Sequence, residues 1–299
     1  MGTEARMKDP KFLIGLTLAG IAAALVIVAL VPRAPREPVY QGRSLRAWLV
    51  EFDPGEGTTN YSAAQEAIRA MGTNSLPHLI RYLRSQDPPF YAQWVRLKAK
   101  LRVLRDPVEY AVFWHRRAAT ACGEFGQDAE PAFPALIKAM NDQHAASHVG
   151  NALSRMLPKS APVLTNILAT GNVSARYRAA DALGTAFSHP EIEEMSRTAL
   201  LEALRDPDSG LRMTAASALQ FWNKRLDLVV PALTRALSDP DPSVRGNAAT
   251  SLGNFGSAAL SAVPELLKLL QDTNDYPRRR AMEMLLKIDP DAAAKATRK

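Results

Sequence analysis

The carboxyl-terminal two thirds of the chain distribute apolar and polar residues with the period of an α-helix. Val244, Ala248 and Leu252 recur four residues apart, so their side chains share one face of a helix. A second apolar stripe surrounds Leu266, and Pro264 stands at its start, where a helix tolerates the missing N–H of proline. The pattern predicts two helices joined by a short polar link.

The predicted helix pair repeats every 33 residues, and shorter copies extend towards the amino end. The positions that keep this step form five columns: Asp206, Asp239 and Asp272; Arg212, Arg245 and Arg278; Ala215, Ala248 and Ala281; Leu219, Leu252 and Leu285; and Leu204, Leu237 and Leu270. Earlier copies cover residues 61–83, 115–140, 144–170 and a stretch beginning at Arg176, and residues 276–290 look like a final half-unit. We therefore expect an all-α fold, a right-handed α-solenoid of about seven antiparallel helix pairs.

Three stretches, DPDPSVRGNAATSLGNFG, DPDSGLRMTAASAL and RRAATACGEFGQDAEPAFPALIKAM, resemble the HEAT repeat family, specifically its PBS-lyase-type HEAT-like members. The resemblance covers residues 60–290. It implies that the repeated Asp and Arg form a hydrogen-bonded ladder between neighbouring units. In the third unit His148 would take the arginine place and Asp142 the acid place, whereas Thr170 would replace the acid in the fourth. Because this family includes scaffolds, transport factors, enzyme subunits and a few enzymes, the resemblance implies a fold and leaves the function open.

Residues 12–31 form an uncharged apolar run of 20 residues ahead of the repeats. As a helix the run spans about 30 Å, the thickness of the bilayer core. The run is longer than the apolar region of a secretory signal peptide, and VALVPRAP at its end has no clear A-x-A cleavage site. We therefore expect an uncleaved membrane anchor, with a cleaved signal peptide as the alternative.

The anchor divides the chain into four predicted parts: a tail over 1–11, the transmembrane helix over 12–31, a proline-rich linker over 32–43 and the solenoid over 44–299. Ser44 is a candidate N-cap for the first short helix of the solenoid. Three basic residues precede the anchor and four follow it closely, so the positive-inside rule gives no strong orientation. We expect a single-pass protein of a bacterial inner membrane and slightly favour the exported side for the solenoid.

The formal net charge of +7 is concentrated in two segments. Residues 1–50 carry +4, residues 96–117 carry +5, and all other residues together carry −2. The basic character therefore gives no support for a nucleic-acid-binding body. The single cysteine, Cys122, cannot form an internal disulfide or a thiolate metal site, and its place in the column of Leu252 predicts a buried thiol.

An insertion over about 86–114 separates the first two copies and contains a basic amphipathic stretch. Lys98, Lys100 and Arg102 flank its apolar stripe, and Trp114 is one of the aromatic residues that bracket it. We favour a helix packed on the solenoid with a solvated basic rim. Contact with an anionic membrane surface or an acidic partner, and contact with nucleic acid, remain the alternatives.

Two clusters could be mistaken for chemical sites. Asp239, Asp241 and Arg245 resemble an acid, a base and an anion clamp, but the repeat predicts them as structural residues, with Asp241 as an N-cap. His144 and His148 lie one helical turn apart but lack the glutamate of a metalloprotease motif. We expect no catalytic residues, no metal and no cofactor.

Solenoids commonly bind macromolecules on a concave surface built by adjacent units. The leading hypothesis is a membrane-anchored scaffold that binds a protein or peptide along the second helices, where Lys138, Arg235 and Lys268 are candidate contacts. Trp222, in a link between helices, is a further candidate. The alternatives are an enzyme accessory or lyase-like HEAT protein, and a binder of nucleic acid or an anionic surface through the insertion, nucleic acid being disfavoured.

Overall fold

The computed structural model describes residues 36–52, 60–87, 89–91, 93, 110–142 and 144–297. Its contacts divide the chain into Met1–Glu37 and Pro38–Lys299, and the description below concerns the second unit. The predicted membrane helix over 12–31 and the basic part of the predicted insertion lie outside the described residues. None of the helices within the described residues is long and apolar enough to cross a bilayer.

The second unit opens with a small hairpin that replaces the last part of the predicted linker. Strands β1 (Val39–Tyr40) and β2 (Arg43–Ser44) pair antiparallel, and both residues between them adopt positive φ, 48° at Gln41 and 75° at Gly42. Such a two-residue turn matches the twist of paired strands, so the chain folds back before residue 43 instead of remaining extended. Ser44 then caps α3 (Leu45–Glu51) by accepting a hydrogen bond from the Ala47 amide, as expected.

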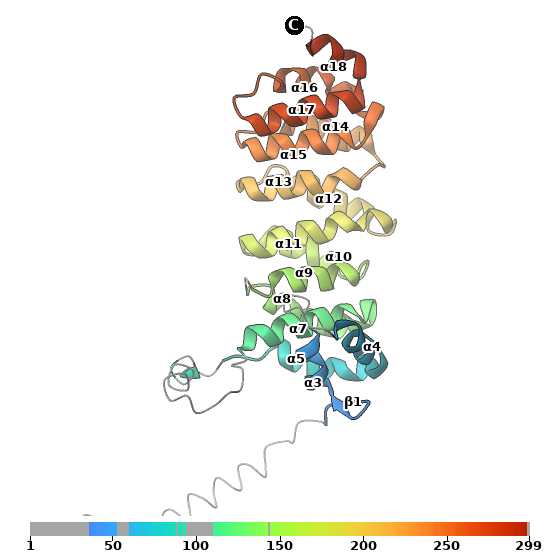
Figure 1. Ribbon diagram of the computed structural model, residues 1–299, viewed down its shortest axis with the longest axis vertical. Helices are drawn as coiled ribbons and strands as arrows, with labels where there is room; N and C mark the ends of the chain where they lie inside the picture. The colour runs from blue at the N-terminus through green and yellow to red at the C-terminus, as the bar shows by residue number, and fades with distance from the viewer. Residues whose placement is uncertain are drawn as a thin grey trace, which may run out of the picture. The chain divides into compact units, whose positions relative to one another are not determined.

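Seven consecutive helix pairs follow in the described part of the chain, each with a first and a second helix. The pairs are α4 (Tyr61–Met71) and α5 (Leu76–Leu83), α7 (Ala111–Gly123) and α8 (Phe133–Ala139), α9 (Ala146–Arg155) and α10 (Ala161–Thr170), α11 (Val173–Gly184) and α12 (Glu193–Ala203), α13 (Ser209–Ala218) and α14 (Leu226–Ala236), α15 (Pro242–Gly253) and α16 (Val263–Leu269), and α17 (Asp275–Ile288) and α18 (Pro290–Thr297). They stack in chain order (Figure 1). The predicted final half-unit is therefore a complete pair, closed by α18.

The first helices from α7 to α17 pack directly on one another, whereas contacts between second helices are sparser. In the first pair the arrangement differs, because α5 packs on α7 and α4 packs on α3. The close row depends on small residues, and its core contains many buried alanines. Cys122 lies in this row with no exposure, which confirms its predicted burial, and burial raises the pKa of its thiol to about 12.

Gly184 lies where α11 packs against α13. A Cβ built on Gly184 would lie 2.9 Å from the Cβ and 3.2 Å from the Cα of Ala218. The nearest obstacle therefore includes backbone, which cannot rotate away as a long side chain would. The better helix propensity of a larger residue, worth about 1 kcal/mol, cannot compensate for separating two helices.

We predict that Gly184→Val lowers the free energy of unfolding by about 2 kcal/mol, because the valine methyl groups overlap α13. Thr198→Val, at an exposed position of α12, should change it by less than about 0.5 kcal/mol. Urea unfolding followed by circular dichroism measures both variants. Equal stability of the two would contradict the close packing of α11 on α13.

Candidate functional site

Arginine and aspartate side chains join each of the later units to the next, and we call each such pair a rung. Arg212 Nε and Nη2 donate to the two carboxylate oxygens of Asp239 at 2.7 and 2.8 Å, and Arg245 binds Asp272 in the same way at 2.6 and 2.8 Å. Arg176 binds Asp206 through one nitrogen. These charge-assisted bonds, two of them bidentate, fix both distance and orientation between neighbouring units.

Each full rung also ties down its own unit. Arg245 Nη1 donates to the carbonyl oxygens of Asp239 and Pro240 at 2.8 and 3.0 Å, so one guanidinium spans two consecutive inter-unit loops. Asp241 caps α15, with its carboxylate accepting from the Ser243 amide at 2.7 Å. The residues that resembled a catalytic cluster are thus occupied by helix capping and by the rungs.

Arg278 forms only part of a rung within the described residues. Arg278 donates to the carbonyl oxygen of Asp272 at 2.6 Å and pairs with Asp275 of its own helix. Within the residues described, no further unit follows α18 to supply an acid.

His115 takes the arginine place in the rung between the second and third units. Its Nδ1 lies 3.3 Å from Asp142 Oδ2, and its Nε2 lies 2.9 Å from the carbonyl oxygen of Ser85. These two partners match the carboxylate and the loop carbonyl that Arg245 binds. The gapless overlay of residues 115–140 on 245–270 already placed His115 over Arg245, so the sequence contained this signal.

His148 does not take the arginine place, which corrects the expectation for the third unit. It contacts Thr120 Oγ1 at 3.2 Å, as Asn247 contacts Ser217 at 2.8 Å. By this equivalence the rung position of the third unit falls on Ala146, which has no group to bind an acid. His148 therefore lies two residues beyond the position that is equivalent to Arg245. The helix α9 itself begins only at Ala146.

His144 and His148 do not share a helical face, because His144 precedes α9. The His144 amide donates to Asp142 Oδ1 at 3.0 Å, in the loop before the helix. Among the residues that the structure describes, no three His, Cys, Asp or Glu side chains gather in a way that could hold a metal ion.

The two candidate tryptophans are buried, which corrects their assignment as partner contacts. Trp222 is 1% exposed, while the exposed aromatic residue in its link is Phe221, stacked on Phe187 at 5.6 Å. Trp114 is 6% exposed and stacks on Tyr82 at 4.9 Å, because α5 packs on α7 and covers the indole. The remaining candidates of the insertion, Lys98, Lys100 and Arg102, lie outside the described residues.

Two equivalent grooves lie between consecutive second helices. The α10–α12 groove, of about 210 Å³, has Thr165, Leu168 and Ala169 on one wall and Ala199, Glu202 and Ala203 on the other. The α12–α14 groove, of about 240 Å³, has Leu201, Leu204 and Arg205 on one wall and Ala232, Arg235 and Ala236 on the other. Each position of the first wall has its counterpart 36 residues later, and each position of the second wall has its counterpart 33 residues later. The grooves are therefore products of the repeat.

The charge of the grooves changes while their shape is repeated. Glu202 and Arg235 occupy the same position of successive second helices, and Lys268 and Lys138 occupy it in two other units. All four are exposed, and Lys268 pairs with Glu265 of its own helix at 2.7 Å. Arg205 and Arg235 are exposed and form no ion pair within the described residues. The α12–α14 groove therefore presents two unpaired cations on partly apolar walls.

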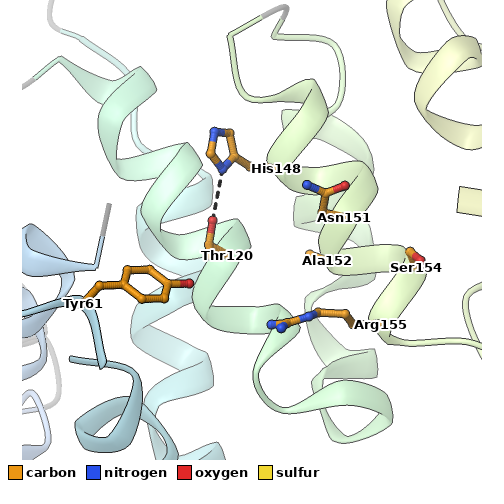
Figure 2. A pocket seen from close by; sticks show the side chains of 7 residues that line it. All are labelled: Tyr61, Thr120, His148, Asn151, Ala152, Ser154 and Arg155. Carbon is orange, nitrogen blue, oxygen red and sulfur yellow. Dashed lines mark hydrogen bonds between the residues drawn. The ribbon is translucent and has the colours of Figure 1, made fainter. Parts of the chain in front are cut away.

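A polar pocket of about 400 Å³ lies on the other side of the units, over the first helices α7 and α9. We call it the α7–α9 pocket; Figure 2 shows the residues that line it, which are Tyr61, Thr120, His148, Asn151, Ala152, Ser154 and Arg155. Tyr61 enters from α4, so three units contribute. Residues from different units and different columns converge here, which the 33-residue period could not reveal.

A buried carboxylate lies behind the α7–α9 pocket. The Glu124 side chain is 0% exposed and binds Gln65 at 2.9 Å, Arg69 at 2.7 Å and Arg155. Burial opposes ionisation of Glu124, but the hydrogen bonds from Arg155, Gln65 and Arg69 outweigh it and hold its pKa below the ordinary value. This network joins the first three units where the Arg–Asp rungs are absent.

Comparison with known proteins supports the repeat. Residues 198–287 match the family model of HEAT repeats, which is under a third of the chain. No curated protein matches the sequence. The repeats over 198–287 are therefore of HEAT type, and the same helix-pair architecture extends through the second unit.

Among solved structures, the karyopherin Kap121p bound to the extreme C-terminus of the protein phosphatase Cdc14p is similar over 85% of this chain, with 16% identity and a TM-score of 0.51. This chain spans 30% of the length of Kap121p. An engineered protein matches at 21% identity over 72% of this chain and 96% of its own, with a TM-score of 0.46. The complex of CpcE and CpcF of phycocyanin lyase from Nostoc sp. PCC7120 matches at 19% identity over 90% and 97%, with a TM-score of 0.37. The karyopherin likeness shows an α-solenoid fold.

We predict that Arg245→Ala lowers the free energy of unfolding by about 3 kcal/mol, because it leaves the buried Asp272 carboxylate without its partner. Arg245→Lys should lower the free energy of unfolding less, because the lysine ammonium keeps the charge but cannot form the two parallel hydrogen bonds. Arg279→Ala is the control, because that side chain is 65% exposed and lies 4.0 Å from Glu283. Chemical unfolding compares the three; a loss no greater for Arg245→Ala than for Arg279→Ala would contradict the rung.

We predict that Glu124→Gln lowers the free energy of unfolding at pH 7 by about 1–2 kcal/mol, since its arginine partners are half exposed. Because the folded pKa of Glu124 lies below its ordinary value of 4.5, its contribution is complete above that value and is lost as pH falls through the folded pKa. The stability difference between wild type and Glu124→Gln should therefore shrink below about pH 5. Urea unfolding of both proteins at pH 7, 5 and 4 measures this stability difference. A difference that does not change with pH would count against an ionised Glu124.

Proposed function

We propose that this chain is a membrane-anchored HEAT-repeat scaffold that binds an acidic segment of a protein partner along its second helices and has no catalytic activity of its own. The observation that supports the proposal most directly is the α12–α14 groove, where Arg205 and Arg235 face solvent without an acidic partner among the described residues.

The groove has the composition expected of a site for an extended chain segment. Leucine and alanine side chains form the apolar part of its two walls, and one arginine stands on each wall. Aspartate or glutamate side chains would pair with these guanidinium groups, while neighbouring apolar side chains would cover the apolar part. Arginine suits this role because its planar head binds carboxylates through two parallel bonds.

The adjoining α10–α12 groove explains how such a scaffold would discriminate. Its shape is equivalent, but the position of Arg235 is occupied by Glu202 and that of Arg205 by Ala169. An acidic segment would be attracted to one groove and repelled by Glu202 in the next. The repeat would then fix where the segment binds, and the variable positions would fix which charge it carries.

A solved structure of similar fold and the apolar run at the amino end support the proposal. Kap121p, an α-solenoid of similar fold, binds the extreme C-terminus of Cdc14p, and this is an analogy of fold alone. The membrane anchor rests on residues 12–31, whose length and lack of charge suit a spanning helix. We propose a single-pass protein of a bacterial inner membrane with the solenoid on the exported side, a topology that a reporter fused after Lys299 would test.

We predict that the double substitution Arg205→Glu and Arg235→Glu weakens partner binding about tenfold, because both cations of the α12–α14 groove become repulsive. A photoreactive phenylalanine analogue at Leu201 of the full-length chain, in its native membrane, reports the bound partner by cross-linking. Lys287→Glu, at an exposed lysine of α17 that forms no ion pair within the described residues, is the charge-reversal control outside the groove.

The same analogue at Leu286, an exposed leucine of α17, controls for unspecific cross-linking. The proposal requires one adduct from position 201 that Lys287→Glu leaves intact. An adduct that forms equally from position 286, or that persists in the double variant, would refute binding in the groove.

A further inference from the structure

The α7–α9 pocket contains hydrogen-bonding groups that the fold itself does not use. The Tyr61 hydroxyl and the side-chain amide of Asn151 make no hydrogen bond within the described residues, although both line the pocket. By contrast, Thr120 donates to the carbonyl oxygen of Arg116, and Ser154 pairs with Thr185 at 2.9 Å. Two donor groups therefore remain for a ligand, and they enter from different units.

A fixed positive charge accompanies these donors. Arg155 lines the pocket while one of its nitrogens binds Glu124, so the buried carboxylate holds the guanidinium in position. Arg69 binds the same carboxylate from α4. Two arginines against one glutamate leave one net positive charge, which a single anionic group would balance. A guanidinium that is held in advance loses less side-chain freedom on binding than a mobile one does.

We infer that the α7–α9 pocket binds a carboxylate group, with Arg155 as the charged partner and Tyr61 and Asn151 as hydrogen-bond donors. In Figure 2 the Tyr61 hydroxyl and the Arg155 guanidinium lie on opposite sides of the pocket, so a carboxylate between them could accept from both. The volume of about 400 Å³ is within the usual range for small-molecule sites. One net charge matches a carboxylate better than a phosphate dianion.

The phenol of Tyr61 stays a donor in this environment. Burial and the nearby Glu124 carboxylate raise its pKa above the ordinary value of 10.0, so it keeps its proton throughout the physiological range. Its ring is held by stacking on Phe52 at 4.8 Å, with the two planes 10° apart. Orientation and protonation of this donor are therefore both set by the protein.

The carboxylate could belong to a free organic acid or to an acidic side chain of a protein. The site differs from the α12–α14 groove, because it lies over first helices of the amino-terminal units. The two sites share no lining residue, so each can be tested by its own substitutions.

Isothermal calorimetry on the full-length chain in detergent micelles tests the inference with three probes. These are succinate, a triglutamate peptide with acetylated and amidated ends, and inorganic phosphate. The double variant Tyr61→Phe and Asn151→Ala removes only groups that make no hydrogen bond within the described residues, so its melting temperature should equal that of wild type. We expect it to weaken carboxylate binding about tenfold, and Arg155→Gln to abolish it. Lys287→Gln, outside the pocket, should leave binding unchanged.

The probe that binds identifies the class of ligand. Binding of succinate alone identifies a small organic acid as the ligand class, whereas binding of the peptide alone identifies a protein side chain. Absence of binding by both, tighter binding of phosphate than of either, or full binding by the folded Tyr61→Phe and Asn151→Ala variant would overturn the inference.

Discussion

The geometry of the later units depends on the rung between an arginine and an aspartate of the next unit. Arg212 and Arg245 each bind both oxygens of the following carboxylate and also the carbonyls of their own loop. The side chains of these pairs are mostly buried, so water competes little with the bonds. Neighbouring first helices are thereby held at one distance, and the spacing of the second helices follows from it.

The rungs also connect the fold to the proposed binding surface. Asp206 and Asp239 are rung acids, and each lines the end of a groove between second helices. Because an arginine neutralises each of them, the charge of a groove is set by its variable positions, which carry Glu202 in one and Arg205 with Arg235 in the other. A constant framework thus presents variable charge, an arrangement suited to selective binding of a partner segment.

The sequence predicted what the 33-residue period controls. It gave the helix pairs, the rung residues, the cap at Asp241 and the burial of Cys122, since identical side chains at one step must have equivalent surroundings. It misplaced His148, because the copy over 144–170 is shorter and its register shows only in the contact with Thr120. It also assigned Trp222 wrongly as a partner contact, because the path of the backbone between α13 and α14, which buries the indole, cannot be read from the repeat. The sequence could not predict the α7–α9 pocket, because Tyr61, Thr120 and Arg155 belong to three different units and to no common column of the repeat.

Zero-length coupling of carboxylates to amines tests whether an acidic segment of a partner binds in the α12–α14 groove. In the full-length chain, Arg205→Lys and Arg235→Lys would keep both charges of the α12–α14 groove and add amines that a carbodiimide joins to carboxylates in direct contact. We expect residue 235 to become linked to an aspartate or glutamate of a single protein partner, and Lys287 to remain unlinked. Linkage of that partner only to lysines outside the groove would contradict it.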